Sequence, residues 1–124
     1  IVLVAVLSGI ALVNFSRFST NAYNQTAQSD YRNLLVAYTD AFTRPDAPLR
    51  YVVRRETGPG SLPSPLDAMR VSPEVEVTVV YTKRLRQNQP PRITSTIEVR
   101  HLEGTKMYRR VEANGVVTEQ IVDL

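Results

Sequence analysis

Residues 1–42 read IVLVAVLSGIALVNFSRFSTNAYNQTAQSDYRNLLVAYTDAF and contain no proline. Apart from Ser8 and Gly9, the first thirteen residues are all apolar, and Arg17 is the only charged residue before Asp30. A helix that is apolar on every side is stable only in lipid or among other helices. At about 1.5 Å per residue, a helix over this stretch would be roughly 60 Å long, about twice the diameter of a small domain. We therefore expect its first half to protrude.

The apolar run over residues 1–13 fits neither of two common kinds of apolar N-terminal segment. It is shorter than the about 20 residues that cross a membrane. It also lacks the preceding basic residues and the following small-residue cleavage site of a secretory signal peptide. We expect it to belong to a longer apolar helix whose first residues lie upstream of Ile1. The residues predicted to form this helix, which would lie in lipid or pack among copies of itself, are Ile1, Val2, Leu3, Val4, Val6, Leu7, Ile10, Ala11, Leu12, Val13, Phe15 and Phe18.

The second half of the predicted helix has a different pattern. At about 100° per residue, an apolar stripe runs along one side, and polar residues such as Arg32 and Asp40 lie across from it. We therefore expect residues 1–22 to contact the membrane or other subunits, and residues 23–43 to pack on a sheet. The side chains predicted to make that packing are Tyr31, Leu34, Leu35, Tyr38 and Phe42.

Residues 44–73 contain six prolines and two glycines, which predicts an irregular connecting loop. Within it, Leu49 to Val53 fits either a short strand or a turn of helix. From residue 74 onward, apolar and polar residues alternate with the period of a half-buried strand. Asn114-Gly115 is typical of a type I′ hairpin turn, because both of its positions need positive φ. The first predicted strand starts at Glu74. The other three cover Ile93 to His101, Thr105 to Glu112 and Val116 to Val122.

These patterns predict an α+β fold. A long protruding N-terminal helix, residues 1–43, packs through its C-terminal half on a four-stranded antiparallel β-meander, residues 74–124. The apolar face of the meander is expected to lie on the stripe from Tyr31 to Phe42, because it is the only other amphipathic surface in the sequence.

This arrangement resembles bacterial type IV pilins and pseudopilins. Ala22-Tyr23-Asn24 and Ser29-Asp30-Tyr31-Arg32-Asn33-Leu34 resemble the middle of pilin N-terminal helices. The family begins with a methylated Phe and has Glu at its fifth position, whereas this sequence has Ala5. Aligning Tyr23-Asn24 with the family instead puts Ile1 several residues inside the pilin helix. We therefore expect the missing features to lie upstream.

The resemblance implies a structural protein and not an enzyme. Its partners would be other copies of the chain in an open helical filament, the inner membrane before assembly, and a pilus or secretion assembly machinery. Its location would be an extracellular filament that begins as a membrane-inserted precursor. Three functions stay open: a pilus subunit, a type II secretion pseudopilin, and a membrane-anchored periplasmic or extracellular binding domain.

Pilin helices in assembled filaments are commonly unwound between a Gly and a Pro. Here Val13 stands near the place of that Pro, but Ser8-Gly9 remains a weak point, because Gly disfavours helix by about 1 kcal/mol relative to Ala. The residues expected to unwind are Ala5, Ser8 and Gly9. The alternative is that Gly9 simply allows neighbouring helices to approach closely.

The sequence offers little for catalysis or cofactor binding. It has no cysteine and a single histidine, His101, so we predict no catalytic, metal or cofactor site. The net charge of +3 is small for a dedicated nucleic-acid binder. Residues 83–92 nevertheless form a basic hairpin loop, which fits either contact with DNA or another anionic surface, or simple solvation. The residues predicted for an anion contact are Lys83, Arg84, Arg86 and Arg92.

Overall fold

The computed structural model describes the backbone of residues 2–124 and the side chains of residues 19–124. This part of the chain forms one helix, α1 (Val2–Phe42), followed by strands only. The strands are β1 (Arg50–Thr57), β2 (Gly60–Ser61), β3 (Arg70–Val71), β4 (Val75–Arg86), β5 (Gln89–His101), β6 (Lys106–Ala113) and β7 (Val116–Asp123). Five of them form one antiparallel sheet in the order β1-β4-β5-β6-β7, and β2 pairs with β3. The predicted α+β class is therefore confirmed.

The sheet has one strand more than the sequence predicted. The four strands after residue 74 are present as expected, but β1 joins them at the edge of the sheet beside β4. The count of four strands was therefore wrong, and of the two alternatives for Leu49 to Val53 the structure shows the strand. Tyr51 and Val53 point into the core and pair with Tyr81 and Val79 of β4. The prolines of this region lie outside the ends of β1, so they bound the strand without interrupting it.

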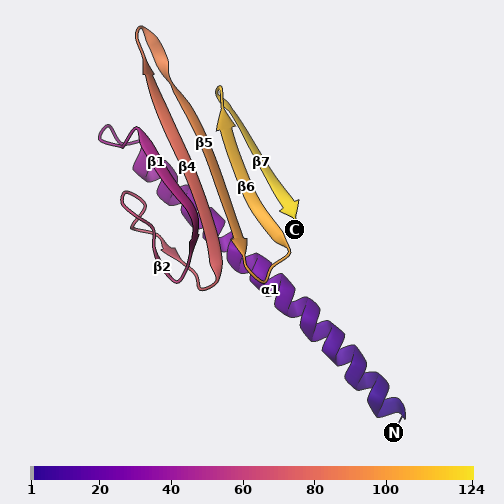
Figure 1. Cartoon of the computed structure of the whole chain (residues 1–124). Coiled ribbons are helices and arrows are strands. Elements are labelled where there is room, and N and C mark those ends of the chain that lie inside the picture. Colours follow the sequence, from indigo (N-terminus) through magenta and orange to yellow (C-terminus); the bar gives the residue numbers. More distant parts are fainter. Residues whose placement is uncertain (1) are drawn as a thin grey trace.

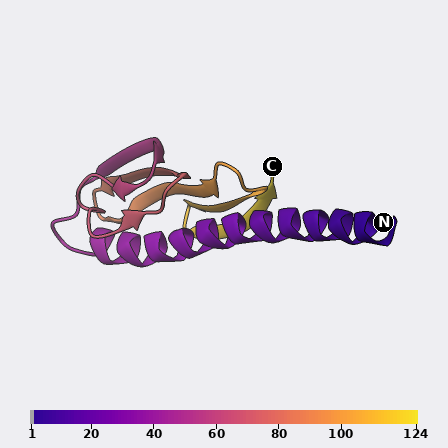
Figure 2. The same cartoon turned by 90° about the horizontal axis from the view of Figure 1, so that it is seen from below.

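Helix α1 lies across one face of the sheet and extends beyond it at the N-terminal end (Figures 1 and 2). The predicted apolar stripe is confirmed: Leu34, Tyr38 and Phe42 are buried in the core, and Leu35 packs at its margin. No helix in the described part of the chain is both long and apolar enough to cross a membrane.

The helix is continuous through Ala5, Ser8 and Gly9, so the single chain does not unwind there. Helix formation is cooperative, and good helix formers such as Ala5 and Leu7 surround the weak point, which offsets the low propensity of Gly9. The expectation of unwinding stays a prediction for the assembled filament alone.

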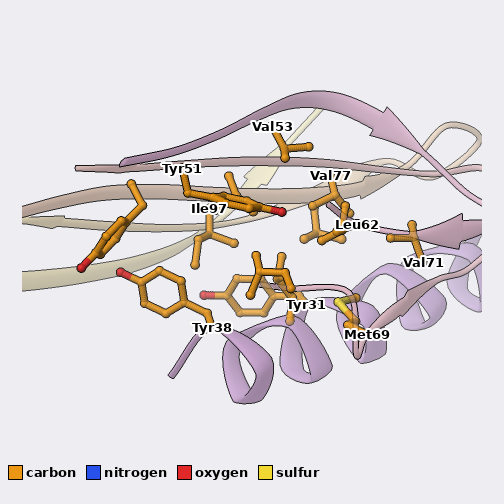
Figure 3. Close-up of a cluster of buried hydrophobic side chains, with 14 of the residues drawn as sticks. Tyr31, Tyr38, Tyr51, Val53, Leu62, Met69, Val71, Val77 and Ile97 are labelled. Atoms are coloured by element: carbon orange, nitrogen blue, oxygen red, sulfur yellow. The ribbon is translucent and has the colours of Figure 1, made fainter. Parts of the chain in front are cut away.

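The core lies between α1 and the inner face of the sheet (Figure 3). On β4, Val75, Val77, Val79 and Tyr81 are at most 1% exposed and alternate with partly exposed residues. Burying a side chain of this size contributes about 1.5–3 kcal/mol relative to leaving it in water. The segment between β1 and β4 closes one side of the core with four buried side chains, Leu62, Leu66, Met69 and Val71.

Two turns set the register of the C-terminal half of the sheet. Asn114 and Gly115 have φ values of 54° and 79°, which confirms the predicted β6–β7 hairpin turn. The β4–β5 turn is much shorter than the predicted loop over residues 83–92. Only Gln87 and Asn88 lie outside the two strands, and Asn88 takes a positive φ of 58°. The basic residues of this region therefore lie mainly on paired strands.

Candidate functional site: the helix and its anchors on the sheet

The candidate site for assembly is α1, because it combines the apolar run with a surface that packs on the sheet. Ile1 lies outside the described residues. The remaining predicted assembly residues belong to α1, but their side chains also lie outside the described part; they are Val2, Leu3, Val4, Val6, Leu7, Ile10, Ala11, Leu12, Val13, Phe15 and Phe18. What the structure describes in detail is how the second half of α1 is held.

The first anchor is Asn24, which is only 7% exposed and reaches the turn between β5 and β6. Its Oδ1 accepts hydrogen bonds from the backbone N–H groups of Thr105 at 2.9 Å and Lys106 at 3.3 Å. Its Nδ2 donates to Thr105 Oγ1 at 3.1 Å. Gly104 permits this approach, because a Cβ at that position would lie 2.6 Å from Asn24 Oδ1. One side chain thus satisfies two backbone donors of a turn that is 81 residues away in sequence.

The second anchor is Asp30, which is 4% exposed and joins α1 to the segment that precedes β4. One carboxylate oxygen accepts from the Ser72 backbone N–H at 2.8 Å, and the other accepts from Ser72 Oγ at 2.9 Å. A buried carboxylate is costly unless hydrogen bonds satisfy it, and bonds to a charged group contribute about 1.5–3 kcal/mol each. These two hydrogen bonds therefore tie the segment before β4 to the helix.

Aromatic side chains hold α1 on either side of these two anchors. Tyr23 stacks on His101 at the end of β5, with ring centroids 4.4 Å apart. Near the C-terminal end of the helix, Phe42 lies 4.1 Å from Tyr81, measured between ring centroids. Tyr38 contacts both of those rings at 5.0 and 5.9 Å. The contacts extend along the sheet-bound half of the helix.

His101, the last residue of β5, is buried and packs within the fold. It is 5% exposed, and its Nδ1 accepts a hydrogen bond from the Glu103 backbone N–H at 3.1 Å. Among the residues that the structure describes, no three His, Asp or Glu side chains converge where they would hold a metal ion. Its ring stacks on Tyr23, and its Nδ1 accepts a hydrogen bond within the turn that Asn24 contacts.

Tyr31 links α1 to the far edge of the sheet. Its hydroxyl donates to Glu119 Oε1 of β7 at 3.0 Å, and its ring lies 5.9 Å from that of Tyr108. Burial and the neighbouring Glu119 carboxylate raise the pKa of Tyr31 above its ordinary value, because both disfavour a phenolate. The hydroxyl therefore stays a proton donor at neutral pH.

Sequence reasoning did not single out the two polar anchors. Asn24 and Asp30 appeared in the stretches that carried the pilin resemblance, but not among the packing residues. A signal was available, because both residues fall close to the phase of the apolar stripe that includes Ala27, Tyr31 and Leu34. A polar residue inside an apolar stripe is expected to be buried and therefore to have a hydrogen-bond partner. Its partner was not predictable, since it depends on a turn far along the chain.

The four residues predicted to contact anions all lie on the β4–β5 hairpin but differ in their surroundings. Arg86 donates to the Pro90 carbonyl from Nε at 3.2 Å and from Nη2 at 3.0 Å. Arg92 donates from Nε to Asn114 Oδ1 at 3.1 Å. Arg84 stands directly across from Arg92, and Lys83 stands across from Ile93 on the opposite face. The structure thus brings Arg84 and Arg92 together and separates Lys83 from them.

Comparison of the chain with protein-family models, curated proteins and solved structures finds no match. The structure by itself establishes an N-terminal helix packed on an antiparallel sheet, which is compatible with a pilin-like fold.

Proposed function

We propose that this protein is the structural subunit of a type IV pilus-like extracellular filament and that it polymerises through the first half of α1. One observation carries the proposal. The helix extends past the sheet (Figure 1) at the end where the sequence is apolar on every side. Among the residues whose side chains the structure describes, the first anchors to the sheet are Tyr23 and Asn24. A helix of this kind needs a partner outside its own domain.

The energetics support assembly over a solitary subunit. Each CH₂ group left in water costs roughly 0.8 kcal/mol, so the apolar run is stable in lipid or against other copies of itself. In the proposed pathway the inner membrane holds the subunit first. An assembly machinery then exchanges lipid contacts for helix contacts, at little net hydrophobic cost.

The expected geometry is an open helical polymer. Parallel helices packed by a repeated, staggered contact use two different surfaces of each subunit, and such a contact continues without closing. The division of α1 supports this arrangement, because Leu34, Tyr38 and the two anchors, all between residues 24 and 38, already tie the helix to the rest of the domain. Removing the apolar half should therefore abolish assembly and leave the domain folded.

Electron microscopy of the purified protein tests the proposal. The full chain is dispersed in neutral detergent, the detergent is removed, and the sample is compared with a chain that starts at Ser19, which retains every anchor described above. We expect long filaments from the full chain only, with the same β-sheet circular dichroism from both chains. Filaments from the shortened chain, or a dispersed full chain after detergent removal, would contradict the proposal. The length of filaments on cells then separates a pilus from a pseudopilus.

A further inference from the structure

The β4–β5 hairpin projects beyond the rest of the sheet (Figure 1). Pairing between β1 and β4 stops at Arg50 and Thr82, and pairing between β5 and β6 stops at Ser95 and Glu112. Residues 83–94 therefore form a two-stranded ribbon with no lateral strand on either side, here called the β4–β5 ribbon. Two strands alone are at best marginally stable in water. The core does not require this projection.

The ribbon is basic, and its charges are not neutralised. Residues 83–94 include Lys83 and three arginines but no acidic residue. Arg84 and Arg92 are directly opposite each other, an arrangement that destabilises an antiparallel pair when the charges have the same sign. Among the side chains that the structure describes, no carboxylate forms an ion pair with either of them. Arg92 is held by the neutral amide of Asn114, which orients its guanidinium without cancelling its charge.

These arginines form part of a pocket on the face of the sheet that points away from α1. The next cross-strand pair is Thr82 and Thr94, and the two threonines line a pocket of about 280 Å³ together with Arg84 and Arg92. Arg50 of β1 pairs with Thr82 and so lies on the same face. The alternate face of β4 carries Val79 and Tyr81, which are buried against the helix. The pocket thus presents guanidinium and hydroxyl donors to solvent.

We propose that the β4–β5 ribbon binds duplex DNA through its phosphate groups. Arg50, Arg84 and Arg92 would contact phosphates, and the hydroxyls of Thr82 and Thr94 would donate hydrogen bonds to phosphate oxygens. Contacts of this kind are independent of base sequence and position a protein on the duplex. A two-stranded ribbon also has the width that the major groove of B-DNA admits.

Two features favour DNA over other partners. Pro90 and Pro91 lack backbone N–H groups, so this part of the ribbon is poorly suited to adding a strand from another protein. The ribbon also lies at the end of the molecule opposite the N-terminus of α1 (Figure 1). If the apolar half of α1 is held in a bilayer, as the proposed function requires, the ribbon points away from the lipid headgroups of that bilayer.

Binding of DNA by one subunit does not depend on the proposed function, but tighter binding by several subunits of a filament does. In a filament, repetition of the ribbon would let one DNA molecule contact several subunits, and linked contacts bind far more tightly than single ones. The test therefore uses the dispersed chain, so that a failure to bind DNA and a failure to form filaments are observed separately.

The test measures fluorescence anisotropy of a labelled DNA duplex of mixed sequence with the full chain in neutral detergent at 50 to 200 mM KCl. With three phosphate contacts, the logarithm of the affinity should fall with the logarithm of salt at a slope of about −2.7, a loss of about 40-fold over this range. The variant Arg84→Gln with Arg92→Gln should reduce the slope to about −0.9, so that its affinity falls only about 3.5-fold over the same range. The matched control, Arg54→Gln with Arg70→Gln, removes the same charge from exposed positions outside the ribbon and should keep the wild-type slope.

Equal losses of DNA affinity in the two double variants would overturn the proposal, because binding would then depend only on the net charge of the protein. Absence of binding at 50 mM KCl would overturn it as well. A further arm offers phosphatidylserine vesicles and, as a neutral reference, phosphatidylcholine vesicles. Ribbon-dependent binding to the anionic vesicles without binding to DNA would assign the surface to lipid and reject DNA. Thermal unfolding midpoints equal to wild type in both double variants establish that differences in binding do not arise from misfolding.

Discussion

The two halves of α1 belong to one continuous helix but differ in how their apolar and polar residues are distributed. The half from about Asn24 to Phe42 is amphipathic, with one apolar and one polar side. Its apolar side buries Leu34 and Tyr38, and hydrogen bonds from Asn24 and Asp30 hold it to segments that connect the strands. The half from Val2 to Phe18 is apolar in sequence nearly throughout and extends past the sheet (Figure 2). A helix can therefore carry two separate tasks, provided that its side chains change pattern where the task changes.

This comparison implies that stability and assembly are separable. Substitutions in the second half should lower the free energy of unfolding of the domain. Substitutions in the first half should change only what the helix does outside the domain. The predictions below test the first statement in order of decreasing effect, and the closing measurement tests the second.

The largest effect is expected for Leu34→Ala. Leu34 is 0% exposed at the centre of the helix–sheet contact, and truncating a buried Leu costs about 2–5 kcal/mol through lost burial and the cavity left behind. The matched control is Val36→Ala, two residues away on the same helix and 72% exposed, which should change stability by less than about 0.5 kcal/mol. Urea unfolding followed by circular dichroism measures both. Equal losses would mean that the stripe does not hold the helix to the sheet.

A smaller loss is expected for Asp30→Ala. The change leaves the Ser72 N–H and hydroxyl without their acceptor, which should cost on the order of 2–3 kcal/mol. Asp40→Ala removes the same charge from the same helix, but its ion pair with Arg44 is exposed and should contribute less than about 1 kcal/mol. The same unfolding experiment distinguishes them. If Asp30→Ala were as mild as its control, the carboxylate would not be an anchor.

The contrast between these residues also shows what sequence could predict. Leu34, Tyr38 and Phe42 were predictable because helical periodicity depends only on local spacing. The strands from Val75 onward were predictable because alternation with a period of two is local as well. In the same way Asn114-Gly115 predicted its hairpin, since the required φ values are a property of the two residues themselves.

Features that depend on distant partners were not predictable. β1 lies among prolines and glycines that predict a loop, and what identifies it as a strand is its pairing with the distant strand β4. The partners of Asn24 and Asp30 lie 81 and 42 residues away. The face shared by Arg84 and Arg92 depends on the register of the hairpin, which the sequence suggested only as a basic loop.

The smallest effect near neutral pH concerns the tyrosines of the core that the sheet-bound half of α1 covers, because it develops only at alkaline pH. The pKa values of Tyr31, Tyr38, Tyr51, Tyr81 and Tyr108 are all raised, chiefly because burial disfavours the phenolate, and residues 1–18 contain no tyrosine. For Tyr51, burial with a smaller contribution from Asp67 raises the pKa from 10.0 to about 12. The unfolded chain releases this proton near pH 10 and the folded chain near pH 12. The stabilisation is therefore complete below pH 10 and is lost as pH rises to about 12.

Tyr51→Phe isolates this contribution. Between pH 10 and about 12, the raised pKa of Tyr51 should lower the free energy of unfolding by at most about 1.4 kcal/mol per pH unit. The free energy of unfolding of the variant should fall less steeply with pH in that range. Below pH 10 it should be lower than that of the wild type, because the variant lacks the hydrogen bond from Tyr51 to the Pro63 carbonyl. Urea unfolding at pH 8, 10, 11 and 12 gives the slopes. Parallel slopes for variant and wild type would show that Tyr51 does not keep its proton in the folded state.

The most direct test of the central claim is a charge in the apolar half. Leu12→Asp should abolish filaments in electron micrographs while the free energy of unfolding of the domain stays within about 0.5 kcal/mol of wild type, because the described anchors and core residues lie from Tyr23 onward. The matched control is Leu85→Asp, the same change at a side chain that is 67% exposed, which should leave filaments intact. Normal filaments from Leu12→Asp, or a domain that unfolds with it, would contradict the division of α1 into an assembling half and a sheet-bound half.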